Sequence, residues 1–280
     1  AMKGAARVLA DGRKARERLV RDLDVLVPFA QAASAFEVLQ AAGWTFKAAG
    51  AWQKDWHMMD AIAHHHAWSL SDGAVELDLH HFSNSLNRLV GDDDGLWQRS
   101  GEITWRGLAV GLPSPADAMI LSIVHGLRWS REHNADWIID ACSCLDGAAV
   151  DWPLVIAETR RRQVEAIMLA GLGYMQDTLR RDIPADVMAA LAATAMPLQR
   201  RELEVYAGVA MPRTPEHNQP LLAMALQRCG RPPGPASPRP EHAAVEWKAI
   251  SLPQRSSLDI SRFAAGAETA TFTVRLLSGH

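Results

Sequence analysis

The spacing of apolar residues along the chain changes near Pro113. Before that point apolar and polar residues alternate in short runs, as in Val75-Glu-Leu-Asp-Leu-His80, and a period of two residues is typical of β-strands. After it, apolar residues recur at helical spacing in segments that open with capping sequences such as Ser114-Pro-Ala-Asp117. The pattern predicts an α+β fold, with a small mixed β-sheet and flanking helices over residues 1–112 and an α-helical bundle over residues 113–210.

The same pattern predicts the individual elements. In the first part we expect a helix that begins at about Gly4, a second helix over residues 29–41, and strands at residues 23–27, 44–47, 64–70, 74–80 and 103–110. In the second part we expect helices that begin near residues 114, 134, 151, 163, 184 and 198. Residues 211–280 contain a Pro-rich linker and one strand-like run at 269–277 without a clear partner. We therefore expect this tail to be loosely ordered.

Two of the predicted strands carry acidic side chains on one face. Asp22 and Asp24 lie at the start of a Val- and Leu-rich run, and residues two apart on a strand point the same way. In a later strand Glu76, Asp78 and His80 share the face opposite the apolar residues. Carboxylates held side by side repel each other, and a hard cation such as Mg²⁺ removes that repulsion. The competing interpretation is a solvated strand edge with surface acids, because charged residues are mostly exposed.

Composition narrows the classes of function. The chain has 280 residues and a formal net charge of −3, so we expect no broad surface for nucleic acids, although basic residues cluster just before Asp22. Its cysteines, Cys142, Cys144 and Cys229, form neither a disulfide framework nor a metal-binding spacing. No apolar run has the length of a membrane span, and no signal peptide precedes the first motif. We therefore expect a cytoplasmic protein without a membrane partner.

Taken together, the motifs resemble those of the uncharacterised nucleotidyltransferase family within the polymerase-β-like superfamily. The resemblance rests on an ordered series of motifs between residues 2 and 196: Met2-Lys-Gly-Ala-Ala, Arg18-x-x-x-Asp22-Leu-Asp24, Val75-Glu-Leu-Asp78-Leu-His80, Leu112-Pro-Ser-Pro-Ala-Asp117, His125-Gly-Leu-Arg128 and Trp137-Ile-Ile-Asp140. The first acidic motif is moderately specific, and the ordered set is much more so. By this resemblance we expect a nucleotidyltransferase core over residues 1–112, followed by the helical bundle.

The resemblance also implies an activity and a set of site residues. In this superfamily, two acids on one strand and a third on a neighbouring strand hold metal ions, so Asp22, Asp24 and Asp78 are expected to be the catalytic and metal-binding residues. The expected cofactor is Mg²⁺, with two ions, and the expected substrate is a nucleoside triphosphate. The nucleoside monophosphate is expected to pass to a hydroxyl of an acceptor that the sequence does not identify: a protein, an RNA end or a small molecule.

The nucleotide-binding residues are expected from the same comparison. Lys3 and Gly4 stand where related enzymes have a Gly-Ser turn that binds phosphates, although the lysine departs from the usual small residues. Arg18 and Arg21 are assigned to nucleotide binding with them. The family normally has further chain before this turn, so we interpret the sequence as a fragment or a trimmed protein.

Several assignments stay open at this level. Glu76 is the alternative to Asp78 as the third acid, and we favour Asp78 because the family has an acid, an apolar residue and a histidine there. For His80 a packing or hydrogen-bonding role is favoured over metal ligation. A degenerate nucleotide-binding or regulatory module with the same fold is the alternative to an active enzyme.

Overall fold

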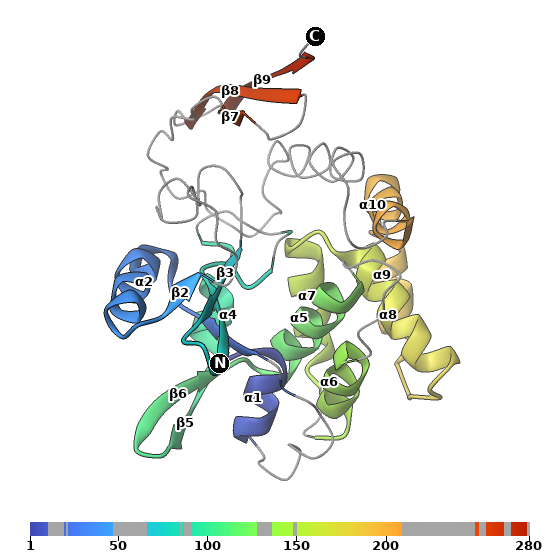
Figure 1. Ribbon diagram of the computed structural model, residues 1–280. Helices are drawn as coiled ribbons and strands as arrows, with labels where there is room; N and C mark the ends of the chain where they lie inside the picture. Colours follow the sequence, from blue (N-terminus) through green and yellow to red (C-terminus); the bar gives the residue numbers. More distant parts are fainter. Residues whose placement is uncertain are drawn as a thin grey trace.

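The structure is a computed structural model of the chain, and one sheet and a set of helices account for most of it (Figure 1). It describes residues 1–10, 20, 22–46, 66–84, 86, 91–127, 136–147, 150–208, 250–251, 256–265 and 270–278. The predicted α+β class is confirmed, because a mixed sheet near the N-terminus is followed by a helical region.

The sheet has four strands in the order β1-β4-β3-β2. Its strands are β1 (Leu23–Leu26), β2 (Thr45–Phe46), β3 (Ala67–Ser71) and β4 (Glu76–His80). β1 and β4 are parallel, whereas β3 pairs antiparallel with both β4 and β2. The sheet is therefore mixed as predicted, and β3 and β4, which correspond to the strands expected at residues 64–70 and 74–80, form an antiparallel hairpin. Its register places Asp24 directly opposite Asp78.

Helices lie on both sides of the sheet and make up the second part of the chain. They are α1 (Lys3–Ala10), the 3₁₀ helix η2 (Phe29–Gln31), α2 (Ala32–Ala41), α4 (Asp94–Arg99), α5 (Pro115–Leu127), α6 (Asp136–Leu145), α7 (Trp152–Arg161), α8 (Glu165–Asp177), α9 (Ala185–Ala192) and α10 (Pro197–Gly208). The capping residues act as predicted: Ser114 Oγ accepts a hydrogen bond from the backbone N–H of Asp117 (3.2 Å), and Asp151 Oδ1 accepts one from Leu154 (3.0 Å).

Three clusters of buried apolar residues hold these elements together. The first packs Phe36 of α2 against Trp68, Leu70, Leu77 and Leu79 of the sheet. The second lies among the helices α5 to α9. The third joins the two parts, because Met2 and Leu26 of β1 pack with Leu96 of α4 and Leu121 of α5. Leu26 follows Asp24 two residues later on the same strand, so this third cluster fixes the acidic strand against the helices.

Two predictions about strands are wrong. Residues 103–110 were expected to form one strand, but the structure has an antiparallel pair, β5 (Gly101–Trp105) and β6 (Leu108–Leu112). Arg106 and Gly107 form the turn, both with positive φ (49° and 81°), which suits a tight hairpin. The tail strand β9 (Ala270–Ser278) does have a partner, because it pairs antiparallel with β8 (Ser256–Ala265), which pairs in turn with β7 (Ile250–Ser251).

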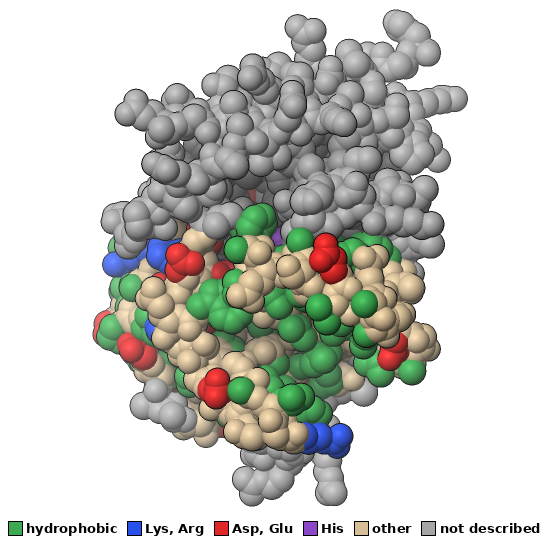
Figure 2. Space-filling model, turned by 90° about the vertical axis from the view of Figure 1, so that its left-hand side faces the viewer, with side chains coloured by type: hydrophobic (Ala, Val, Ile, Leu, Met, Phe, Trp, Pro, Cys, Tyr) green, Lys and Arg blue, Asp and Glu red, His purple; other side chains and the backbone are tan. Residues whose placement is uncertain are grey.

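One face of the molecule carries exposed apolar side chains. The helix α2 and the β5–β6 hairpin lie on the left in Figure 1, and Figure 2 looks at that side, where hydrophobic side chains are widespread between scattered charged ones. Val38 on α2 and Leu108 on β6 are 68% and 62% exposed. Among the described residues, no helix combines the length and the apolar character that crossing a bilayer requires.

Candidate active site

The centre of the candidate site is the pair of neighbouring strands β1 and β4. Asp24 and Asp78 are register partners on these parallel strands, and opposed side chains in a sheet have Cβ atoms about 5 Å apart. Asp24 is buried, at 5% exposed, and Asp78 is partly buried. Two carboxylates from separate strands therefore meet on one face of the sheet.

Asp24 is held by two nitrogen donors at the same oxygen. His80 Nε2 lies 2.8 Å from Asp24 Oδ1, and Lys3 Nζ lies 2.5 Å from that atom. Burial alone would raise the pKa of Asp24. The hydrogen bond from His80 and the charge of Lys3 outweigh burial and hold the pKa well below its usual range. Asp24 is therefore a fixed negative charge at neutral pH, although it is almost inaccessible to solvent.

Lys3, which contacts Asp24, has an unusual backbone conformation. It is the first residue of α1 and has a φ of 49°, in the left-handed region that residues with a side chain rarely adopt. The preceding residue is fixed to the sheet, because the backbone N–H of Met2 donates to the carbonyl oxygen of Asp24 (3.0 Å). Gly4 is buried in the first turn of the helix. The predicted Lys-Gly turn at the start of a helix is thus present, and its lysine points to the acidic strand.

The other two acids differ from Asp24. Asp78 Oδ1 accepts a hydrogen bond from Ser69 Oγ of β3 (2.6 Å). Asp22 lies just before β1, and its pKa is raised, first by burial and then by the negative charges of Asp24 and Asp78. The carboxylate of Asp22 is therefore close enough to Asp24 and Asp78 for their charges to raise its pKa. It does not accept a hydrogen bond from Lys3 or His80, the two donors that stabilise Asp24.

The ligand atoms that lie closest together belong to Asp24, Asp78 and His80, which all fall within 4.8 Å of one another. Sequence reasoning expected Asp22 in this group and favoured another role for His80. Alternation shows only that His80 shares a face with Asp78, whereas its contact to Asp24, a hydrogen-bonding role of the kind favoured from the sequence, depends on how β1 and β4 pair. Two carboxylates and an imidazole are a donor set that suits a divalent cation, so the residues present fit a metal.

His80 can either donate a hydrogen bond to Asp24 or bind a metal ion, because its other ring nitrogen contacts the backbone of Phe82. His80 Nδ1 lies 3.3 Å from the carbonyl oxygen of Phe82. Burial and the charge of Lys3 lower the pKa of His80, so the ring is neutral and carries one N–H. With that proton on Nε2 the ring donates to Asp24. With it on Nδ1 the ring donates to Phe82, and Nε2 is free to bind a metal, as is usual for histidine ligands.

Other predicted residues fall outside this group. Arg18 and Arg21 lie outside the described residues. Glu76 is partly buried at the start of β4, opposite Ser71 of β3, and is absent from the group of closest ligand atoms. The structure thus brings Asp78, rather than Glu76, beside Asp24.

A cavity of about 170 Å³ lies next to Lys3. Its walls come from α1, α5 and α6 and include Lys3, Arg7, Ser122, Asp140 and Ser143. Arg7 NH1 lies 3.9 Å from Asp140 Oδ1, so charged groups from α1 and α6 face each other here. The cavity therefore extends from the N-terminal lysine toward the helices.

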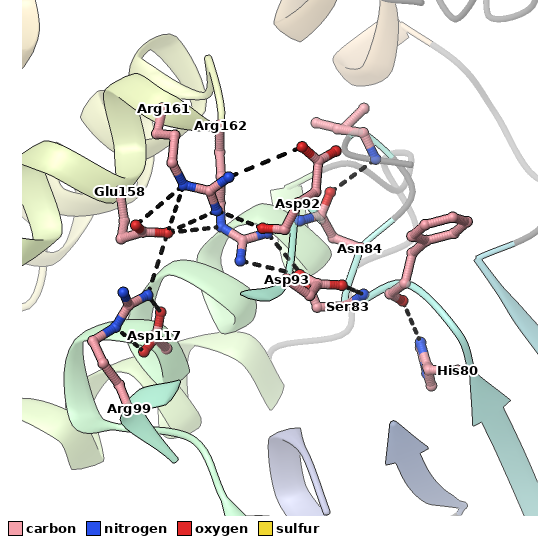
Figure 3. Close-up of polar contacts among 12 residues, drawn as sticks. His80, Ser83, Asn84, Asp92, Asp93, Arg99, Asp117, Glu158, Arg161 and Arg162 are labelled. Atoms are coloured by element: carbon pink, nitrogen blue, oxygen red, sulfur yellow. Dashed lines mark hydrogen bonds and ion pairs between the residues drawn. The ribbon is translucent and has the colours of Figure 1, made fainter. Parts of the chain in front are cut away.

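A buried network of charged groups follows β4 and was not foreseen from the sequence (Figure 3). The carboxylate of Asp93 accepts hydrogen bonds from the backbone N–H and the hydroxyl of Ser83 (2.7 and 2.5 Å) and from the guanidinium of Arg162 (3.1 Å). Arg162 also pairs with Glu158, which pairs in turn with Arg161 and Arg99. The chain just beyond His80 is thereby tied to helix α7.

Comparison with known proteins adds to this geometry. A sequence model of a family described as uncharacterised nucleotidyltransferase matches residues 1–180. The chain belongs to this family. The matched segment contains Lys3 and the acidic strands β1 and β4, and it reaches through α8. The resemblance seen in the motifs is thus confirmed. Neither the curated proteins nor the solved structures contain a significant match to the chain.

Proposed function

We propose that this nucleotidyltransferase moves a nucleoside monophosphate from a nucleoside triphosphate to a hydroxyl of an acceptor, with Mg²⁺ held at Asp24 and Asp78. The observation that carries the proposal is the placement of Asp24 opposite Asp78 on parallel strands, with His80 completing a group of ligand atoms, in a chain of this family. Asp22, whose charge interacts with both acids, is proposed to join them when a cation neutralises the cluster.

The reaction needs groups that the site contains. The hydroxyl oxygen of the acceptor forms a bond to the α-phosphorus, the bond from that phosphorus to the bridging oxygen breaks, and pyrophosphate leaves. Asp78 is proposed to take the proton of the hydroxyl, because it is less buried than Asp24 and is oriented by Ser69. When bound, Mg²⁺ supplies charge stabilisation for the attacking and leaving oxygens.

The phosphates are proposed to bind at the start of α1. Backbone N–H groups at a helix N-terminus attract anions, and Lys3 adds a positive charge there. The cavity beside Lys3 leads toward α5 and α6, so the nucleoside is proposed to point to the helices. The acceptor is a protein, an RNA end or a small molecule.

Thermal stabilisation by nucleotides tests the proposal. Each of the four nucleoside triphosphates is added with and without Mg²⁺ to the wild-type chain and to Asp24→Asn. We expect stabilisation that requires both the metal and Asp24. Incubation of the chain with labelled nucleotides and a cell lysate, followed by mass spectrometry, then identifies the acceptor. Metal-dependent stabilisation without transfer to any acceptor would instead support a binding module that has lost turnover.

A further inference from the structure

We propose that the ammonium group of Lys3 is a built-in counter-cation that competes with the metal ion for Asp24. This inference rests on the metal site of the proposed function and specifies how that site is filled. It concerns the metal-free protein, in which the lysine takes the place of an external cation.

The competition follows from a shared acceptor atom. Asp24 Oδ1 lies 2.5 Å from Lys3 Nζ and 2.8 Å from His80 Nε2, so two donors already use its lone pairs. Asp24 also belongs, with Asp78 and His80, to the group of residues that each offer one ligand atom within 4.8 Å of the others. A Mg²⁺ ion bound to Asp24 Oδ1 would sit about 2.1 Å away and would require the same lone pairs. The ammonium and the metal therefore exclude each other at Oδ1.

Burial makes the ion pair between Lys3 and Asp24 strong enough to compete with a metal ion. The side chains of Lys3 and Asp24 are 9% and 7% exposed, so solvent screens their attraction only weakly. The surrounding acids add to the effect, because the negative charges of Asp24 and Asp78 both act on Asp22 and raise its pKa. A cation at this point is thus required in both states of the site, and Lys3 supplies it when no metal is bound.

The backbone of Lys3 is an independent observation in favour of this role. Its φ of 49° is strained for a residue with a side chain, and it persists between Met2, which is fixed to Asp24, and the buried Gly4. In this conformation the side chain of Lys3 pairs with Asp24 of the acidic strand. Strained backbone of this kind is common where a side chain must be held at a functional site.

The test measures binding of Mn²⁺ alone, by titration calorimetry and by the loss of the free-ion signal in electron paramagnetic resonance. We expect weak binding to the wild-type chain and binding about tenfold tighter to Lys3→Met, within the usual range for coupled sites. Arg7→Met is the matched control. It removes a charge one turn along the same helix, from a side chain that is also 9% exposed but pairs with Asp140. Its affinity for Mn²⁺ should equal that of the wild type.

Further variants separate the outcomes. Lys3→Arg keeps the charge and should bind Mn²⁺ as weakly as the wild type, whereas Lys3→Gln should bind it tightly even where Lys3→Met folds poorly. Equal affinities for the wild type, Lys3→Met and Lys3→Gln would overturn the competition while leaving the metal site intact. Adding Asp24→Asn to Lys3→Gln should abolish binding. If no variant bound Mn²⁺, or if this double variant bound it fully, the metal site of the proposed function would fail and the competition with it.

Discussion

At the scale of single residues, Asp22 and Asp24 show how two acids with almost the same sequence surroundings acquire opposite electrostatics. The competing interpretation from the sequence, a solvated strand edge with surface acids, does not hold for Asp24, because the residue is buried and paired with Lys3 and His80. For Asp22 the surroundings are unfavourable to charge, and burial and its acidic neighbours raise its pKa.

Replacing each of these acids by asparagine should therefore change stability in opposite directions in the metal-free chain. The raised pKa of Asp22 means that its ionisation costs stability as the pH rises through that value, so Asp22→Asn should raise Tm near neutral pH and have little effect below about pH 3.8. The lowered pKa of Asp24 contributes stability above about pH 3.8, so Asp24→Asn should lower Tm near neutral pH. Calorimetric scans from pH 3 to pH 8, without metal, measure both. Effects of the same sign would contradict this assignment.

A second pair of variants distinguishes the two acids of β4. Asp78→Asn should retain metal-dependent binding of the triphosphate through Asp24 but lower the rate of transfer by roughly 10²-fold or more, because the proton acceptor is lost. Glu76→Gln is the matched control on the same strand and should transfer at the wild-type rate. Single-turnover transfer and equilibrium binding of the nucleotide separate the two effects. A large loss in Glu76→Gln with normal transfer by Asp78→Asn would mean that Glu76 is the third acid.

The sequence predicted the part of this site that depends on local alternation, but not the part that depends on how the strands pair. Alternation along one strand fixes which side chains share a face, so the sequence alone predicts that Asp78 and His80 lie on the same face. The pairing of β1 with β4 and the reach of Lys3 across 21 positions to Asp24 depend on tertiary structure. The composition of the closest ligand group, with His80 in place of Asp22, followed from that pairing rather than from any local motif.

At the scale of elements, local signals were informative wherever a residue type has a strong backbone preference. Ser114 and Asp151 begin helices at the predicted places because their side chains accept backbone N–H groups. The β5–β6 hairpin was missed because Arg106, which carries a side chain, occupies a turn position with positive φ. Of the two turn residues, only Gly107 is of a type that favours a turn. An isolated glycine within a strand pattern can equally mark a bulge, so it does not identify a hairpin.

Packing between helices gives an element-scale prediction with an internal control. A Cβ at Gly171 of α8 would lie 2.4 Å from Ile123 Cγ2 of α5, whereas a Cβ at Gly173 would lie 3.8 Å from its nearest neighbour, Met188 Cε. Gly171→Ala should therefore destabilise the fold by about 1–3 kcal/mol through overpacking. Gly173→Ala should stabilise it by up to about 1 kcal/mol, because alanine is the better helix former. Urea denaturation measures both, and equal effects would show that α5 and α8 are not closely packed at Gly171.

At the scale of the whole molecule, the sheet and the helices are joined by two different kinds of contact. Apolar contact is made by the cluster around Met2, Leu26 and Leu121. Polar contact is made by the charged network around Arg162, which is 1% exposed. Arg162 binds Asp93 and also Ser83, which lies just after β4. Both contacts converge on the strands that carry the acids, so the geometry of the candidate site depends on the helical part of the chain.

Loss of Arg162 should therefore disturb the molecule on both sides of this junction. Arg162→Met leaves the buried carboxylate of Asp93 without its guanidinium partner, and breaking a buried ion pair in this way costs about 3–5 kcal/mol of stability. The amide of Ser83, which donates to Asp93 (2.7 Å), should also exchange faster with solvent. Denaturation and hydrogen exchange of the wild type and the variant measure the two effects.

Arg160→Met is the control for that experiment, because Arg160 lies in the last turn of α7, two residues before Arg162, but is exposed and, among the described residues, binds groups in and just after α9, such as the carbonyl oxygen of Ala190 (2.8 Å). Its stability should stay within about 0.5 kcal/mol of the wild type, as for most surface substitutions, with normal exchange at Ser83. If Arg162→Met destabilised the chain but left exchange at Ser83 unchanged, the network would support α7 alone. Faster exchange at Ser83 in Arg162→Met, but not in Arg160→Met, would show that the helical part holds the chain beyond β4 in place.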